Sequence, residues 1–167
     1  MNGMMFSELC QTTAQILNLP LPDNFSNGEV VVVDDVDLQL VQDTNNMNLA
    51  RLFLELGDIK HEDKVEVYES LFAIQLLMEG VVDGQFVLDN LHDRIMFVVR
   101  LPLSDQTEPE QLAGVIQLFV RQVSEWRATI LFGRLFDDEF DDALDDDTFS
   151  DPPVMQVQPM TMPVSLA

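Results

Sequence analysis

Residues 62–79 read EDKVEVYESLFAIQLLME and predict a helix that carries two apolar stripes instead of one. A surface helix needs a single stripe, because it covers a single core. Two stripes predict two buried surfaces: the chain's own sheet on one side and a second copy of this helix on the other. A central helix enclosed within one monomer is the alternative. One stripe comprises Val65, Tyr68, Phe72 and Leu76; the other, which we assign to a dimer interface, comprises Val67, Leu71, Ile74 and Met78.

Acidic residues dominate the charge of the chain. Its 167 residues include 30 Asp and Glu against 8 Lys and Arg, which gives a formal net charge of -22. This field disfavours nucleic acid and anionic membrane surfaces, whose phosphates attract Lys and Arg, and it favours basic or cation-bearing partners.

The cysteine content and the hydropathy pattern predict a soluble cytosolic protein. The single cysteine, Cys10, excludes an internal disulfide and fits a reducing compartment. No basic residue precedes Arg51, so a secretory signal is not predicted. No apolar run approaches the ~18 residues of a membrane span.

Eight elements follow from the spacing of apolar residues. The predicted helices cover residues 4–19, 62–79 and 107–133, and the predicted strands cover residues 29–33, 36–42, 49–56, 85–88 and 94–100. The connections between the first three strands are too short for parallel crossovers, so these strands are expected to pair in antiparallel fashion. The order α-β-β-β-α-β-β-α predicts an α+β fold, with helices packed on a twisted antiparallel sheet.

A change of composition divides the chain near Phe136. Residues 1–133 predict one folded domain. Residues 137–151 hold nine of the 30 acids, and the stretch from Pro152 to Ala167 holds four prolines and no charge. Residues 134–167 are therefore expected to form a mostly disordered tail, acidic at first and then containing Pro and Met.

The sequence lacks the patterns of common catalytic and metal sites. There is no phosphate-binding glycine loop, no zinc-protease helix motif and no nucleophile elbow. His61 and His92 are expected at the surface. The D-x-D within Asp34–Asp37 lies in a predicted turn, and Asp137–Asp147 lacks the glycine and the final glutamate of a calcium loop. We therefore predict a protein that is not an enzyme and needs no metal or cofactor.

Apolar residues also occupy the sheet face that helices would leave uncovered. If Leu52, Leu54 and Phe97 point into the core, their strand neighbours point away from it, where a water-facing sheet would be polar. Left uncovered, these neighbours make a patch of the size that marks binding sites; helices or a dimer partner would otherwise cover them. Together with two residues of the first helix, they are the candidate partner-binding residues: Phe6, Leu9, Val31, Val33, Val41, Phe53, Met96 and Val98.

These elements together resemble the type III secretion chaperones of the CesT (Tir chaperone) family. The resemblance covers about residues 6–133 and rests on order and spacing, because no single motif is diagnostic. It departs from the family in the longer and more acidic tail, and at Met78-Glu79, where the family usually has Asn-Leu. The residues that carry it are Phe6-x-x-Leu9, Leu17-x-Leu19-Pro20, Val36–Leu40, Leu52–Leu56 with Gly57, Leu76-Leu77-Met78-Glu79-Gly80, Leu101-Pro102-Leu103, and Phe119 with Glu125-Trp126-Arg127.

The resemblance implies a small, acidic, homodimeric chaperone of the bacterial cytoplasm that takes part in virulence. Such proteins hold the amino-terminal segment of a secreted effector in extended form, keep it secretion-competent and use no ATP themselves. The implied partners are the effector and a second copy of the chain, with the secretion-system ATPase as a further candidate. The partner-binding residues above are then effector-binding residues.

Two other functions remain open from the sequence. One is a generic acidic adaptor that binds a basic partner electrostatically; its binding would weaken steeply with salt, whereas apolar binding would weaken much less. The other is a metal-dependent enzyme that uses the cluster Asp34–Asp37.

Overall fold

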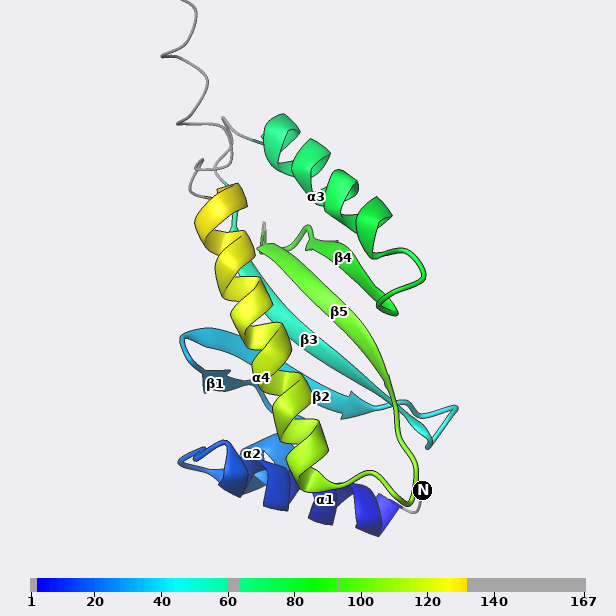
Figure 1. The fold of residues 1–167 in the computed structure, drawn as a ribbon. Helices are drawn as coiled ribbons and strands as arrows, with labels where there is room; N and C mark the ends of the chain where they lie inside the picture. The colour runs from blue at the N-terminus through cyan, green and yellow to red at the C-terminus, as the bar shows by residue number, and fades with distance from the viewer. Residues whose placement is uncertain (1–2, 60–63, 93, 132–167) are drawn as a thin grey trace, which may run out of the picture. The chain divides into compact units, whose positions relative to one another are not determined.

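The computed structural model describes residues 3–59, 64–92 and 94–131, and its elements follow the predicted α+β order (Figure 1). A five-residue helix, α2, and a final π-helical turn, η1, are additions that the sequence did not predict. The elements are α1 (Gly3–Ile16), α2 (Pro22–Ser26), β1 (Val31–Val33), β2 (Val36–Gln42), β3 (Leu49–Asp58), α3 (Lys64–Met78), β4 (Gly84–Asp89), β5 (Arg94–Pro102), α4 (Pro109–Trp126) and η1 (Arg127–Leu131).

The five strands form one antiparallel sheet in the order β1-β2-β3-β5-β4. Strand β5 pairs directly with β3, so β4 lies at the edge although it precedes β5 in the chain. The hairpin between β1 and β2 turns on Asp34 and Asp35, whose φ angles of 47° and 62° suit a tight two-residue turn. Of the acids in the cluster Asp34–Asp37, these two therefore form a turn, as the sequence predicted.

One face of the sheet carries the core. Alternate residues of β2, β3 and β5 point to this face, where Leu38 pairs with Leu54 and Leu54 pairs with Phe97. All three side chains are almost fully buried. Helix α4 lies across this face in Figure 1, and contributes Ile116 and Val120 to the core. The sheet thus holds the helices through one continuous apolar layer.

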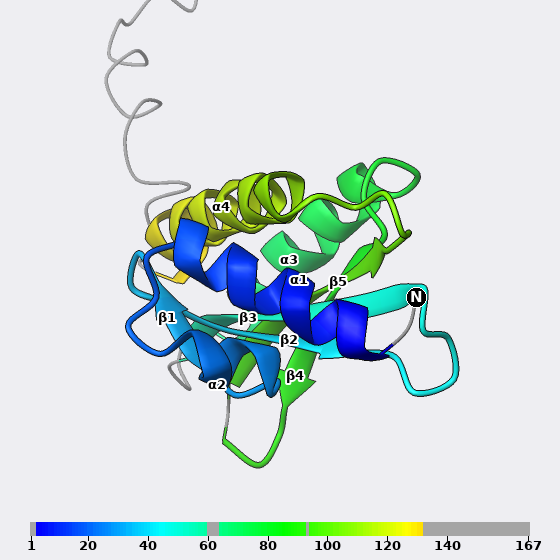
Figure 2. The same ribbon diagram turned by 90° about the horizontal axis from the view of Figure 1, so that it is seen from below.

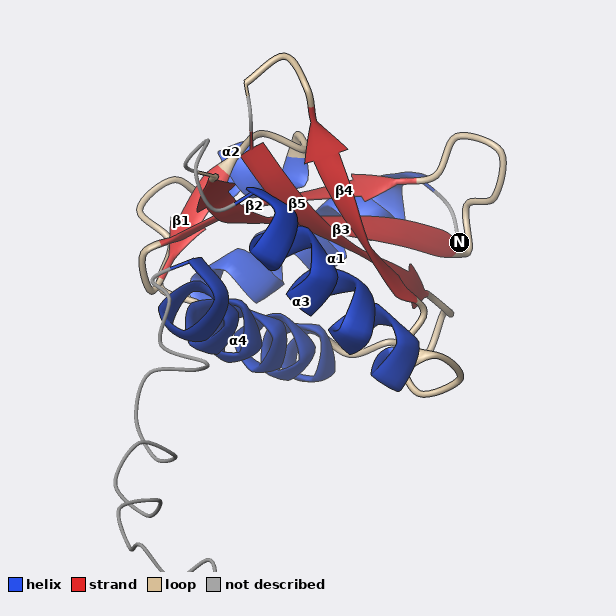
Figure 3. Cartoon of the chain, turned by 90° about the horizontal axis from the view of Figure 1, so that it is seen from above, coloured by secondary structure: helices blue, strands red, loops and turns tan. Residues whose placement is uncertain are grey.

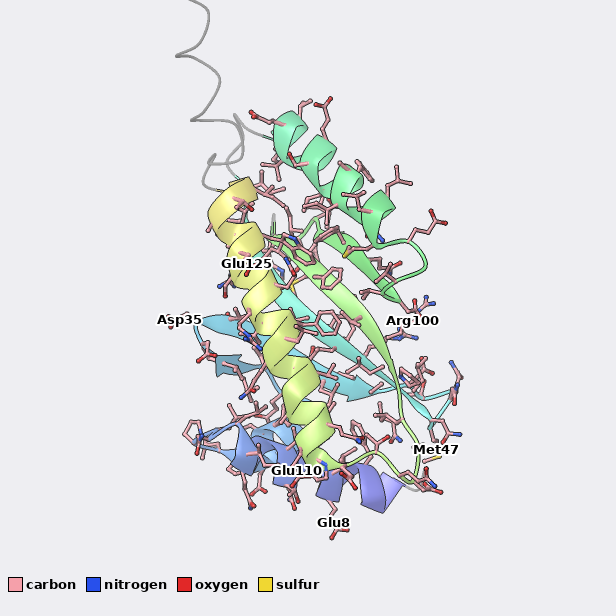
Figure 4. The ribbon with its side chains drawn as sticks, viewed as in Figure 1. Glu8, Asp35, Met47, Arg100, Glu110 and Glu125 are labelled. Carbon is pink, nitrogen blue, oxygen red and sulfur yellow. The ribbon has the colours of Figure 1, made fainter. Side chains whose placement is uncertain are left out.

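Helices α1 and α3 lie beside α4. Helix α1 packs beside α4, as the view from below shows (Figure 2). Helix α3 contacts the edge strand β4, and the view from above shows it next to α4 (Figure 3). Glu8 on the outer side of α1 points away from the sheet (Figure 4). We refer to the covered side as the core face and to the opposite side as the open face.

Two features show how the strands and α4 are held together. Four aromatic rings from β4, β5 and α4 pack with centroid separations of 4.9 to 6.0 Å, and belong to Phe86, Phe97, Phe119 and Trp126. Beside them the Arg127 guanidinium donates hydrogen bonds to three backbone carbonyls, those of Asp35, Glu55 and Leu56. These contacts tie the end of α4 to β3 and to the β1–β2 turn.

The start of α4 differs in detail from the predicted capping box. The sequence pattern places Thr107 at the cap with Glu110 three residues later. In the structure Glu108 is the cap residue, and its backbone N–H donates to Gln111 Oε1 at 3.4 Å. Thr107 Oγ1 instead accepts a hydrogen bond from Ser104 N at 2.9 Å and closes the preceding turn. Pro109 at the first helical position fixes this start.

No helix in the part of the chain that the structure describes is both long and apolar enough to cross a membrane. The predicted tail, residues 134–167, lies outside the described residues, and so does His61.

Candidate functional site

Helix α3 carries the two predicted stripes, and the stripe that we assigned to a dimer interface faces the chain's own core. Val67 and Leu71 are only 3% and 5% exposed, because they pack against the chain's own core. Ile74 and Met78 are half-buried against the same core. The residues assigned to the dimer interface therefore hold α3 on the sheet. Periodicity distinguishes two stripes, but it does not show which of them faces the sheet.

The other stripe is the exposed one. With two neighbours at the carboxyl end of α3, it forms an apolar surface that we call the outer stripe. Tyr68, expected in this set, is half-buried beside the core instead. The members of the outer stripe are 71% to 80% exposed and comprise Val65, Phe72, Leu76, Leu77 and Val81.

Gln75 sets the rotation of α3 against β4. Its Nε2 donates to the Gly84 carbonyl at 2.8 Å, and its Oε1 accepts from the Phe86 N–H at 3.0 Å. Both backbone groups belong to the edge strand, where a further strand would otherwise bind them. This side-chain amide therefore closes part of the β4 edge, and it keeps Phe72 and Leu76 turned outward.

Two hollows border the outer stripe. A cavity of about 290 Å³ lies between α3 and β4, with Tyr68, Leu71 and Phe86 among its walls. A wider depression of about 730 Å³ lies where α3 turns into β4, next to Leu76 and Val81. The outer stripe and these hollows make a surface suited to an apolar partner element.

The open face of the sheet is the second candidate surface. Phe53 pairs with Val98 between the buried pairs of the core face, so both side chains point to the open side. Val98 is buried, Phe53 and Met96 are half-buried, and Val41 is exposed. These four predicted residues therefore lie on one surface. Its apolar members are Val32, Val41, Phe53, Val87, Met96 and Val98.

Strand β1 has the opposite phase to the one predicted. Val31 and Val33 pair with Leu38 and Val36 and point to the core face, where Val33 is 7% exposed. Val32, which is 56% exposed, is the residue of β1 on the open face. A run of consecutive valines carries no alternation, so the sequence could not reveal the phase of this strand.

The predicted contacts on the first helix are also buried. Phe6 and Leu9 belong to the core, in the layer where α1 packs beside α4. Their side chains stabilise the fold and are not available to a partner in this structure. Helical spacing identified the apolar face of α1, but not the helix that covers it.

Three arginines are placed on the open face, a feature that the strongly negative net charge concealed. Arg51 and Arg100 are direct cross-strand neighbours on β3 and β5, and Figure 4 labels Arg100. Arg51 bonds Asp43 at 2.5 Å, whereas Arg100 lies 3.8 Å from Asp83. Arg94, at the other end of β5, bonds Glu55 at 2.9 Å. The sequence does contain a signal for this arrangement: in two predicted strands an arginine lies two positions from an apolar residue, as in Arg51 and Phe53 and in Val98 and Arg100.

Burial or hydrogen bonding shifts the pKa of three groups in the described chain, Cys10, Asp43 and Asp89. Burial raises the pKa of the Cys10 thiol to about 12, so the thiol stays neutral. Backbone N–H donation from Asn45, followed by the Arg51 side chain, lowers the pKa of Asp43. His92 contacts Asp89 at 2.6 Å, and this hydrogen bond lowers the pKa of Asp89. Among residues 3–59, 64–92 and 94–131, no group of three or more His, Cys, Asp or Glu is placed to hold a metal ion.

Comparison with known proteins identifies the fold. No family model and no curated protein matches the sequence. A chain in the crystal structure of the ExsC–ExsE complex is similar with a TM-score of 0.61 and 13% identity, covering 77% of this chain and 95% of that chain. A chain in the HopA1–SchA chaperone–effector complex is similar with a TM-score of 0.54 and 16% identity, covering 75% and 95%. The chain therefore shares the α+β fold of these two chains.

Proposed function

We propose that this chain is a non-enzymatic type III secretion chaperone of the CesT type, which binds the amino-terminal segment of a secreted effector in extended form. The observation that carries the proposal is the amount of apolar surface left exposed on a well-packed domain. Folded monomers rarely expose such surfaces without a partner. The fold supports the same function, because one similar structure is a chaperone–effector complex.

The outer stripe is the proposed dimer interface. Its five side chains are 71% to 80% exposed, so at about 100 Å² for a fully exposed large apolar side chain they would bury on the order of 400 Å² of apolar area per protomer. A stable interface buries about 800 Å² per partner, so flanking residues and the adjoining hollows would supply the remainder. A two-fold arrangement is favoured because it brings the same apolar stripe from both copies together.

The open face is the proposed effector surface. Val41, Phe53 and Met96 offer apolar contacts to an extended segment, and the surrounding acidic surface would keep the complex soluble. Within this proposal residues 1–133 form the chaperone domain and residues 134–167 form its tail. The complex would assemble in the bacterial cytoplasm and pass the effector to the secretion machinery, with the secretion ATPase as the receiving partner.

The test is purification of the tagged full chain from its own bacterium while secretion is active, followed by identification of bound proteins. We expect a secreted protein that is held through its amino-terminal region and is protease-sensitive outside the contacted segment. Phe53→Asp should release it without unfolding the chain. Glu125→Gln, at an exposed position of α4, serves as the matched control and should leave binding unchanged. Recovery of no secreted protein, or of one bound in globular form, would contradict the proposal.

Salt dependence separates this function from that of an acidic adaptor. Apolar contacts should persist at about 0.5 M NaCl, where exposed charge pairs are strongly screened. Release of the partner at that salt concentration would favour the adaptor.

A further inference from the structure

The open face contains a hollow whose walls differ from the rest of the molecular surface. It has a volume of about 230 Å³ and lies over β2 and β3, where Val41 and Phe53 provide apolar walls. Arg51 and Asp43 also line it. The hollow therefore combines an apolar floor with a cation at its margin.

The cationic margin is composed of two arginines. Arg51 on β3 lies directly opposite Arg100 on β5, and both side chains are at least half exposed. Like charges in this cross-strand position repel one another. Asp43 compensates Arg51 from a nearly buried position, but the acid closest to Arg100 is Asp83 at 3.8 Å, which is itself 69% exposed. An additional anion would therefore be stabilised between the two guanidinium groups.

The rest of the chain makes this margin distinctive. With 30 acids against 8 bases, most of the surface repels a carboxylate. Elsewhere in the described chain, Arg127 is engaged with backbone carbonyls and Arg94 is paired with Glu55 and Asp58. Arg121 lies on α4, which covers the core face, and so is remote from the hollow. An acidic group on a partner would thus be directed to Arg51 and Arg100, and it would fix the position of the segment that carries it.

We infer that the hollow is a docking pocket for an extended, acidic segment of the effector, in which a large apolar side chain lies against Val41 and Phe53 and an Asp or Glu two residues away binds Arg51 and Arg100. The spacing matches, because residues two apart in a strand are about 6.6–6.8 Å apart, and Arg51 and Phe53 have this separation along β3. The inference rests on the proposed function, and it specifies the chemistry of the partner. It also predicts that the bound segment is acidic, against the expectation for a chain with this net charge.

The first test uses the full chain and short synthetic peptides, monitored by amide chemical shifts in NMR spectra. The probes are GSSLSESSG, its Lys counterpart GSSLSKSSG, and GSSSSESSG without the apolar side chain. We expect the first peptide to shift the amides of Val41, Arg51 and Phe53, and to bind at least about fivefold more tightly than either of the others. Arg51→Gln with Arg100→Gln should abolish the preference for Glu over Lys, whereas Arg121→Gln on exposed α4 should preserve it.

Equal binding of the Glu and Lys peptides, shifts confined to other surfaces, or no shifts at millimolar peptide would overturn the inference. Deletion of residues 134–167 controls for general repulsion: it should strengthen the binding of acidic peptides but leave their dependence on Arg51 and Arg100 intact. A second test uses the co-purified effector. If the effector binds the double Gln variant as tightly as the wild type, the pocket inference fails while the chaperone function stands. If no effector binds the wild type, the chaperone function fails, and the peptide result still decides the chemistry of the pocket.

Discussion

We predict that Arg127 contributes more than any other side chain to holding the end of α4 on the sheet. Its Nε donates to the Leu56 carbonyl at 2.7 Å, Nη1 donates to Asp35 O at 2.6 Å and Nη2 donates to Glu55 O at 2.5 Å. The register of β3 against β5 shifts between Glu55 and Gly57. The carbonyl of Leu56 therefore lies at a bulge, where the regular ladder does not satisfy it.

The perturbation is Arg127→Met, which keeps the aliphatic stem and removes all three donors. Hydrogen bonds from a charged donor contribute about 1.5–3 kcal/mol each when buried. Arg127 is only half-buried, and water can reach part of the site, so about 1 kcal/mol per bond is the appropriate value. The sum is about 3 kcal/mol. With a urea slope of about 1.5–2 kcal/mol/M, the unfolding midpoint should fall by roughly 1.5–2 M.

The assay is equilibrium urea unfolding, followed by circular dichroism and by the fluorescence of the buried Trp126. Both proteins are compared at one concentration, because self-association would change the apparent stability. Arg127→Lys retains the charge but cannot span three carbonyls, so it should recover less than half of the loss. Arg121→Met on the exposed side of α4 should leave the midpoint almost unchanged. A midpoint for Arg127→Met within about 0.3 M of the wild type would refute the reasoning.

Three further predictions concern the proposed dimer interface, the loss of stability at low pH and the reactivity of Cys10. Phe72→Asp with Leu76→Asp should give a folded monomer by light scattering, whereas Val67→Asp should unfold the domain; a wild type already monomeric at micromolar concentration would contradict the interface. The folded-state pKa of Asp43 is lowered, so its contribution to stability is present above the unfolded value of about 3.9 and is lost as pH falls through the folded value. The urea midpoints of wild type and Asp43→Asn should therefore differ at pH 7 and converge below about pH 4, and parallel curves would exclude the effect. Cys10 should react with a thiol reagent at pH 8 only after unfolding, because burial raises its pKa to about 12; rapid labelling of the native chain would show that the thiol is accessible.

The order and type of the elements could be predicted because they follow from local patterns. Alternation in residues 36–42 and 49–56 predicts strands whatever the rest of the chain does, since successive strand residues point to opposite faces. The paired Asp34 and Asp35 mark the turn that joins β1 to β2, because short acidic residues tolerate positive φ. The resemblance to secretion chaperones predicted a function, which no single motif in the sequence does.

The same patterns left the candidate sites partly unresolved. Val41, Phe53, Met96 and Val98 were correctly placed together, because each alternates with a core residue in its strand. Val31 and Val33 were misplaced, since a uniform run of valines has no phase until β1 pairs with β2. Phe6 and Leu9 were taken for contact residues because their cover, α4, lies about a hundred residues away in the chain.

Tertiary structure decided the questions that depend on distant neighbours. Which stripe of α3 faces the sheet depends on Gln75 meeting the edge of β4, and β4 becomes an edge only because β5 pairs with β3. The pairing of β3 with β5 also brings Arg51 next to Arg100, although 48 other residues separate them in the chain. The periodicity of apolar residues shows which residues share a face of a helix or strand, because the period follows from the local geometry of that element. Which of those faces is buried is decided by contacts between segments far apart in the chain, and these exist only once the sheet has assembled.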